Sequence, residues 1–212
     1  MLILCRKNNF PKIILENKGG SKMKNKLFLL VLAILVFIPI TAVQAETDEL
    51  GYEYTPKKAS EIDFSEGDFY VVPLSGDPTS EDAIYAVYEN SEVEKYEKTL
   101  PTLFAAMPTK FSQYYSSSKW ITRSGVVSLS LQPKKPAYDD PPGMAAAHLQ
   151  KYRWKVVYDK HKNSSKWKNT ASMKAQLHCH ADYPKKFKTP WNIEPHRTES
   201  NYHKVVLKGC NP

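Results

Sequence analysis

The chain has 212 residues, of which 42% are hydrophobic, 12% aromatic and 25% charged. It contains no internal repeat and no low-complexity tract, so its length allows one domain with an ordinary core, with or without an ordered extension. The formal net charge of +8 is misleading, because residues 1–45 carry seven lysines and arginines against Glu16 alone. Without those residues the net charge is only +2.

Residues 23–45 have the pattern of a secretory signal peptide. Lys24 and Lys26 form a positive start, and Leu27–Ile40 is an apolar run that is shorter than the roughly 20 residues of a spanning helix. Small residues at 43 and 45 then predict cleavage before Glu46. We therefore expect signal peptidase to act on the chain, and we expect a secreted, extracellular product from a Gram-positive bacterium.

The predicted division of the chain follows from this signal. Residues 1–22 are a mis-annotated leader, because a signal peptide needs only a short basic start, so translation is expected to begin at Met23. Residues 23–45 are the signal, 46–110 an acidic N-terminal region, and 111–212 a basic C-terminal domain.

Charge is unevenly distributed in the mature part of the chain. Residues 46–100 have a net charge of −11 and residues 101–212 a net charge of +13. This asymmetry indicates either an acidic segment folded onto a basic domain or two faces that meet different partners. Two ordinary solvated surfaces are the remaining interpretation.

The acidic region is expected to begin with a poorly ordered segment, residues 46–60. A strand is predicted at 68–74, ending at a turn that contains Gly76 and Pro78. Thr79 and Asp82 resemble a capping box, and apolar residues at 83, 84, 87 and 88 then have helical spacing. A second acidic helix is predicted at 91–100 and ends at Pro101.

The basic domain is expected to start with a hairpin that bends at residues 123–125 and continues as a strand at 127–132, where apolar and polar residues alternate. Helices are predicted at 144–161 and 170–180, and a closing C-terminal strand at 202–208. The fold class is therefore α+β: a small disulfide-stapled domain with a β-hairpin, two helices and a closing strand, preceded by an acidic α/β extension.

The mature chain keeps two cysteines, Cys179 and Cys210. In an oxidising compartment an even pair predicts a disulfide, with a free catalytic thiol as the alternative.

Several blocks in the C-terminal part resemble a known family. They are Trp120–Pro133, the helix around Trp154, Ser172–Ala181, Trp191–Arg197 and the terminal Cys210–Pro212. Over about residues 112–212 the chain is similar to a family of secreted bacterial proteins known as domain of unknown function 2599. The resemblance implies export, a compact domain and a disulfide between Cys179 and Cys210. It implies no activity, so it transfers no catalytic residue.

Polar residues late in the chain are candidates for chemistry. His180, Asp182 and His196 would suit zinc if the fold brought them together, which gives a secreted metal-dependent hydrolase as the alternative function. Against this, His178 and His180 are two residues apart on one helix and would not share a ligand face. Glu194 is a further candidate for that hydrolase, as a general acid or base, but its neighbour Arg197 favours a structural ion pair. Trp191 is either a ligand platform or a buried core residue. No catalytic residue, metal or cofactor is predicted.

The basic surface is the main functional prediction. Its candidate residues are Lys151, Arg153, Lys155, Trp167, Lys185, Lys186 and Lys188. Lysines interleaved with aromatic rings suit an anionic partner. Outside a cell we expect an anionic cell-wall polymer or membrane surface rather than nucleic acid, and a non-enzymatic binding protein. A further hypothesis is that the acidic region acts as a removable screen, as in a processed antimicrobial or toxin-like factor. A solvated helix face with snorkelling lysines is the alternative.

Overall fold

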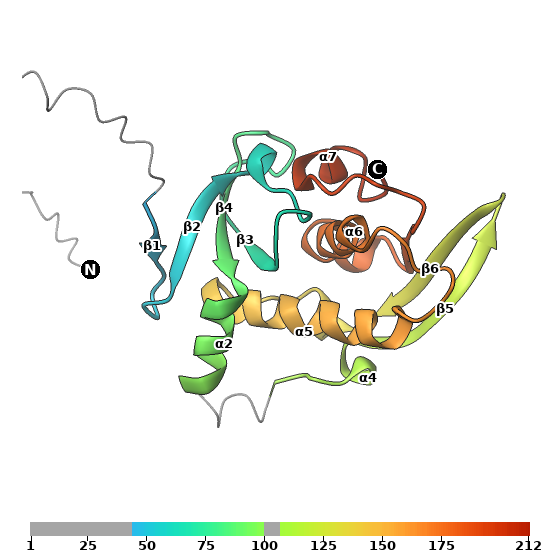
Figure 1. Ribbon diagram of the computed structural model, residues 1–212, viewed down its shortest axis with the longest axis horizontal. Helices are drawn as coiled ribbons and strands as arrows, with labels where there is room; N and C mark the ends of the chain where they lie inside the picture. The colour runs from blue at the N-terminus through green and yellow to red at the C-terminus, as the bar shows by residue number, and fades with distance from the viewer. Residues whose placement is uncertain (1–43, 100–106) are drawn as a thin grey trace, which may run out of the picture. The chain divides into compact units, whose positions relative to one another are not determined.

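The computed structural model describes residues 44–99 and 107–212 (Figure 1). The predicted leader, the predicted signal peptide up to residue 43 and the predicted helix end at Pro101 lie outside the described residues. Within the described part, no helix is both long and apolar enough to span a bilayer.

The acidic region forms a four-stranded antiparallel sheet in the order β1-β2-β4-β3. Its strands are β1 (Glu46–Thr47), β2 (Glu53–Lys58), β3 (Phe69–Ser75) and β4 (Ile84–Glu89). The predicted turn after β3 is confirmed. At this turn Gly76 has φ +92°, and an added Cβ would lie 3.0 Å from the Ala83 Cα, so glycine is required there.

Two predictions in this region are wrong. Residues 46–60 are not poorly ordered, because β1, β2 and the short helix η1 (Ala59–Glu61) lie there. The expected helix around residues 83–88 is strand β4, in which Tyr85, Ala86, Val87 and Tyr88 are all buried. A strand that is buried on both faces has no alternating pattern, so its apolar run also fits helical spacing. Thr79 makes a turn by bonding Asp77 instead of capping a helix.

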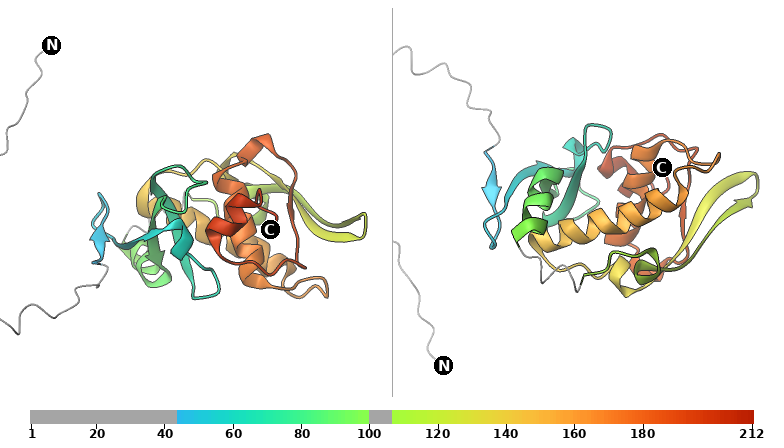
Figure 2. Two further views of the ribbon diagram at one scale, coloured as in Figure 1. Left: turned by 90° about the horizontal axis from the view of Figure 1, so that it is seen from above. Right: turned by 60° about the horizontal axis from the view of Figure 1, so that its bottom comes forward.

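The second sheet is also antiparallel, with the order β5-β6-β7. Strands β5 (Tyr115–Arg123) and β6 (Val126–Pro133) form the predicted hairpin, and β7 (Trp191–Ile193) pairs with residues 129–131 in the middle of β6. The hairpin turns at Ser124 and Gly125, both with positive φ, which is the geometry that matches the twist of two paired strands. Its tip projects from the body of the molecule (Figure 2).

Helices connect the two sheets. They are α2 (Asn90–Thr99), α4 (Phe111–Tyr114), α5 (Gly143–His161), α6 (Thr170–Asp182) and α7 (Tyr202–Leu207), with short helices η2 (Lys135–Ala137) and η3 (Lys185–Phe187). The predictions of α2, α5 and α6 are confirmed. The disulfide between Cys179 and Cys210 joins the end of α6 to the residues after α7, with the two Cα atoms 5.4 Å apart. The α+β class, the hairpin and the disulfide are therefore confirmed.

The predicted closing strand at residues 202–208 is helix α7. The Asn201 side chain accepts a hydrogen bond from the Lys204 N–H and so caps the helix, and Gly209 with φ +63° follows it. Tyr202 and Val205, three residues apart, are buried, whereas Leu207 is 57% exposed. The strand that closes the second sheet is β7 instead.

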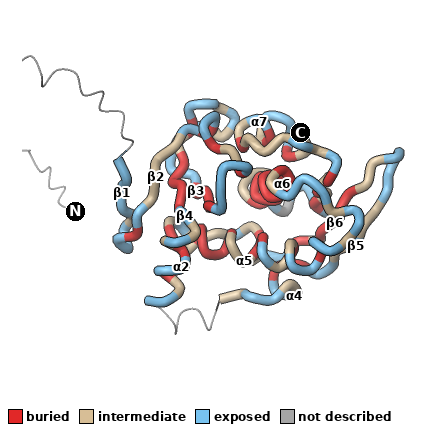
Figure 3. The backbone as a smooth tube through the Cα atoms, in the orientation of Figure 1, coloured by how far each residue is buried: buried red, intermediate tan, exposed pale blue. Residues whose placement is uncertain are grey.

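The two charge blocks share one core. Ile62 and Phe64, between η1 and β3, and Val71 of β3 lie in the same cluster as Ala175 and Cys179 of α6. Tyr202 and Val205 of α7 belong to that cluster too. Buried residues accordingly follow one another in β4, the first half of β3, the start of α5 and residues 172–181 of α6 (Figure 3).

Side chains from the helices cover the free edge of β3. The Gln150 amide donates to the Val71 carbonyl at 2.6 Å and accepts from the Val71 N–H at 3.1 Å. Lys174 donates to the Phe69 carbonyl at 3.0 Å and to Asp68 at 2.8 Å. These bonds satisfy backbone groups that an unpaired strand edge would otherwise leave open.

Candidate functional site

The predicted basic surface does not form one patch. Arg153 does not lie on the surface at all, because its side chain is 0% exposed. Lys151 is 15% exposed and pairs with Glu97 of α2 at 3.1 Å. Lys155 is exposed but pairs with Asp159 one turn further along α5.

The other predicted surface residues are dispersed. Trp167 lies in the loop after α5, where it is partly buried. Lys185 and Lys188 are exposed near η3, and Lys188 donates to the Gly209 carbonyl at 3.0 Å. The side chain of Lys186 is outside the described part of the structure.

A basic cluster does form at the other end of α5, from lysines with partly exposed aromatic rings. We call it the basic aromatic end and define it as Trp120, Tyr158, Lys160, Lys162, Lys166, Trp167 and Lys168. All four lysines are exposed. Asp159 is the carboxylate within this stretch, and it lies 3.0 Å from Lys162.

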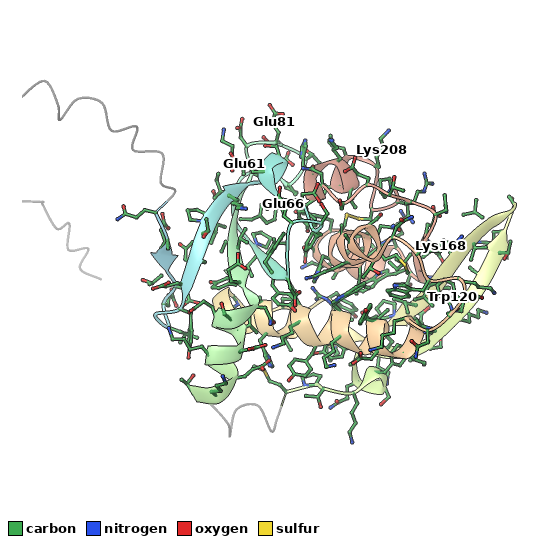
Figure 4. The ribbon with its side chains drawn as sticks, in the orientation of Figure 1. Glu61, Glu66, Glu81, Trp120, Lys168 and Lys208 are labelled. Carbon is green, nitrogen blue, oxygen red and sulfur yellow. A yellow bond between two sulfur atoms is a disulfide. The ribbon has the colours of Figure 1, made fainter. Side chains whose placement is uncertain are left out.

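Ring contacts hold the basic aromatic end together. Trp167 packs on Tyr158 with ring centres 5.7 Å apart, and Trp120 of the hairpin packs on His161 at 6.0 Å. The His161 Nε2 also lies 3.0 Å from the Ser118 hydroxyl. The hairpin, the end of α5 and the following loop are thereby fixed to one another. Figure 4 shows labelled Trp120 and Lys168 toward the hairpin end and Glu61, Glu66 and Glu81 toward the first sheet.

Lysines that contact the acidic region have carboxylate partners there, whereas most lysines of the basic aromatic end have none among the described residues. Lys151 pairs with Glu97, and Lys174, 6% exposed, pairs with Asp68. Among residues 44–99 and 107–212, Lys160, Lys166 and Lys168 form no ion pair. Lys160 instead lies 3.7 Å from the centre of the Phe111 ring.

The predicted polar candidates do not converge on a metal. His180 is buried in α6 and stacks on Trp191 with ring centres 6.1 Å apart. Burial lowers the pKa of His180 to about 4. His196 is half exposed and faces Glu194 instead. In the described ranges no group of three or more His, Cys, Asp or Glu residues is placed to hold a metal ion. The metal-dependent hydrolase built on these residues is therefore not supported.

The remaining polar candidates have structural contacts. Arg197 donates to Glu194 at 2.8 Å, which confirms the expected ion pair. Trp191 is fully buried, and its indole N–H donates to the Lys185 carbonyl at 2.8 Å. It is therefore a core residue and not an exposed ligand platform.

Asp182 lies in a buried charge network that the sequence did not predict. Arg153 Nη1 lies 3.1 Å from both carboxylate oxygens of Asp140, and Arg153 Nη2 lies 4.0 Å from Asp182. Burial disfavours the charged guanidinium, but the two aspartates outweigh it and raise the pKa of Arg153. The helical spacing of Arg153 does indicate its burial. Arg153 lies four residues from both Leu149 and Val157, so the three share the buried side of α5.

The described residues define the class of protein: an α+β protein with two antiparallel sheets, a shared helical core and the disulfide between Cys179 and Cys210. Residues 115–212 match a family model described as "Protein of unknown function (DUF2599)". The resemblance predicted over about residues 112–212 is thus confirmed for the C-terminal part of the chain. No curated protein and no solved structure matches.

Proposed function

We propose that this protein is exported and binds a phosphate-bearing anionic polymer or surface of the cell envelope through its basic aromatic end, without catalysing a reaction. The observation that carries the proposal is the presence of four exposed lysines and three partly exposed aromatic rings at one end of the molecule.

The physical basis is electrostatic attraction combined with ring contacts. Lys160, Lys166 and Lys168 have no carboxylate partner in the described residues, so their charge is available to an external anion. Each lysine near an anionic surface contributes about 1 kcal/mol of attraction. Trp120 and Trp167 add apolar contact area beside these charges, as aromatic side chains do at water–lipid and polymer interfaces.

The acidic region has no screening role in this proposal. Its carboxylates pair with Lys151 and Lys174, and in the described ranges none pairs with the four lysines of the basic aromatic end. We therefore propose that the whole mature chain is the binding form.

The test uses two sources of the same glycerol phosphate chemistry: soluble poly(glycerol phosphate), and phosphatidylglycerol vesicles compared with phosphatidylcholine vesicles. The variant is Lys160→Gln/Lys166→Gln/Lys168→Gln. Its matched control is Lys95→Gln/Lys98→Gln/Lys204→Gln, which removes the same charge from exposed lysines elsewhere.

We expect the first triple variant to bind about 100-fold more weakly, since three contacts of about 1 kcal/mol are lost. The control triple should bind within about threefold of the unmodified protein, because its lysines do not contact the anion. Raising the salt concentration from about 0.1 M to 1 M shortens the screening length from about 10 Å to about 3 Å and should abolish binding. Equal losses in the two triples, or binding that resists salt, would reject the proposal.

Export is a separate part of the proposal and has its own test. The first strand begins at Glu46, so cleavage before that residue would leave every described strand intact. The mass of the protein in culture supernatant should equal that of residues 46–212 less two hydrogens for the disulfide. A mass that includes residues before Glu46 would contradict the proposed cleavage.

A further inference from the structure

A cavity of about 350 Å³ opens where the first sheet meets the helices, away from the basic aromatic end. Its apolar walls include Val72 and Pro73 of β3 and Ala146 of α5. Its charged lining consists of Asp140, Asp182 and Lys185. The cavity therefore combines a hydrocarbon wall with a small number of charged groups, as small-molecule sites do.

Asp182 is the most buried of these charged groups, with a side chain that is 5% exposed. One of its oxygens, Oδ2, accepts a hydrogen bond from the Tyr202 hydroxyl. The other, Oδ1, is 4.0 Å from Arg153 Nη2, which is too far for a hydrogen bond. Among the residues that the structure describes, Oδ1 has no hydrogen-bond donor.

Arg153 cannot neutralise both aspartates equally. Its Nη1 group lies 3.1 Å from both oxygens of Asp140 and 2.9 Å from the Ala137 carbonyl, so the guanidinium is held toward Asp140. Two carboxylates thus share one buried cation, and Asp182 is the one left without a close cationic partner. Burial accordingly raises the pKa of Asp182 to about 7.

We propose that this cavity binds a small organic ammonium ion, whose charged nitrogen is held by Asp182 and whose hydrocarbon part contacts the walls formed by β3 and α5. The ammonium supplies the donor that Asp182 Oδ1 lacks and the positive charge that Arg153 gives mainly to Asp140. Lys185, which is exposed and also lines the cavity, disfavours a second positive charge, so we expect a monocation.

Three probes of nearly equal size and different charge test the proposal: n-butylammonium, 1-butanol and butyrate. Each is titrated into ¹⁵N-labelled protein while amide chemical shifts are followed at Ala146, Ala181 and Lys185. We expect saturable shifts with butylammonium and binding about tenfold weaker with butanol, because a hydrogen bond to a charged group is worth about 1.5–3 kcal/mol. Tighter binding of butyrate, equal binding of butanol, or no saturable shift would each overturn the proposal.

The variant Asp182→Asn keeps an oxygen that can accept from Tyr202 but removes the charge. We expect it to bind butylammonium no more tightly than butanol. The matched control is Glu81→Gln, which removes one exposed carboxylate of the loop between β3 and β4 and should leave the preference unchanged. A preference that survives in Asp182→Asn contradicts the proposal.

A second variant covers the case in which Asp182→Asn does not fold, judged by its near-ultraviolet circular dichroism. Lys185→Ala is an exposed substitution that removes the positive charge lining the cavity. It should tighten butylammonium binding by about threefold and weaken butyrate binding, since like charges repel. Unchanged or opposite shifts in both affinities would place the ammonium elsewhere and overturn the assignment.

Discussion

The acidic first sheet and the basic C-terminal part differ in whether their charged side chains are exposed or are buried in ion pairs. In the first sheet the carboxylates are mostly exposed, and apolar and tyrosine side chains form the interior. In the C-terminal part, Arg153 and Lys174 have almost fully buried side chains, and each pairs with a carboxylate, Arg153 with Asp140 and Lys174 with Asp68. The number of charges in a region therefore says little about its role; what decides it is which charges are already paired.

The comparison also shows that the two charge blocks depend on each other. Asp68 and Glu97 of the acidic region pair with lysines of α5 and α6, and the edge of β3 is covered by Gln150. We therefore expect the two charge blocks to unfold together as one cooperative unit.

Deleting the first sheet should have the largest effect. A chain that begins at residue 107 leaves Ala175, Cys179, Tyr202 and Val205 without the apolar residues that cover them. We expect no cooperative unfolding transition in urea, whereas residues 46–212 should unfold in one step. If the fragment unfolds with the same midpoint, the C-terminal part is independent of the sheet.

A single substitution at the shared core should have the next largest effect. The Phe64 ring is within 5.2–5.8 Å, centre to centre, of the rings of Phe69, His178 and Tyr202, so it joins the first sheet to α6 and α7. Phe64→Ala should lower the free energy of unfolding by about 3–5 kcal/mol. The control Leu74→Ala, at a residue 48% exposed, should change it by about 0.5 kcal/mol or less. Similar values for the two variants would show that the shared core does not stabilise the fold.

Two buried titratable groups of α6, His180 and Asp182, should change the free energy of unfolding with pH in opposite directions. Burial lowers the pKa of His180 to about 4, below the value of about 6.5 in an unfolded chain. The unfolded state therefore binds more protons between pH 6.5 and 4, and the contribution of His180 to stability is lost as the pH falls through that range. Asp182 has the reverse sign, because its pKa of about 7 lies above the unfolded value of about 3.9.

The contribution of Asp182 is therefore lost as the pH rises from about 4 to 7. Asp182→Asn removes this loss, so the stability of the variant relative to the unmodified protein should rise over that range, by as much as about 3 kcal/mol. Urea unfolding at pH 4.5, 6 and 7.5 measures the difference. A constant or falling difference would show that Asp182 does not titrate above its ordinary range.

The smallest effects on stability should come from removing a single ion pair. Lys174, 6% exposed, bonds both Asp68 and the Phe69 carbonyl, whereas the Lys58–Asp82 pair is at least half exposed. We expect Lys174→Met to cost about 1–2 kcal/mol and Lys58→Met about 0–0.5 kcal/mol. Thermal unfolding of the two variants gives the comparison, and equal costs would mean that the contact of Lys174 with β3 adds nothing.

Sequence patterns predicted the parts of the fold that rest on local chemistry. Turn residues predicted the hairpin turn, and helical spacing of apolar residues predicted α5 and α6. The disulfide was predicted because the chain after residue 45 contains only two cysteines. Strand β4 was missed because burial on both faces removes the alternation that identifies a strand. Helix α7 was missed because Val205 and Val206 favour strands, and the cap at Asn201 was overlooked.

The candidate sites were less predictable, since they depend on contacts between distant residues. Sequence reasoning placed Arg153 on the surface with its neighbouring lysines, yet tertiary contacts pair it with Asp140 and Asp182 in the interior. The basic aromatic end joins residues about 40 positions apart, such as Trp120 and Lys160, through the contact of Trp120 with His161. No local sequence pattern indicates that contact.

The contact between Gln150 and Val71 has a consequence for the order of folding. The two residues are 79 positions apart, so β3 is synthesised well before the amide that covers its edge. During that interval the edge can pair only with another chain or with water. A nascent chain is therefore most prone to self-association before α5 has been synthesised. We expect Gln150→Ala to increase aggregation during refolding more than it slows the refolding itself.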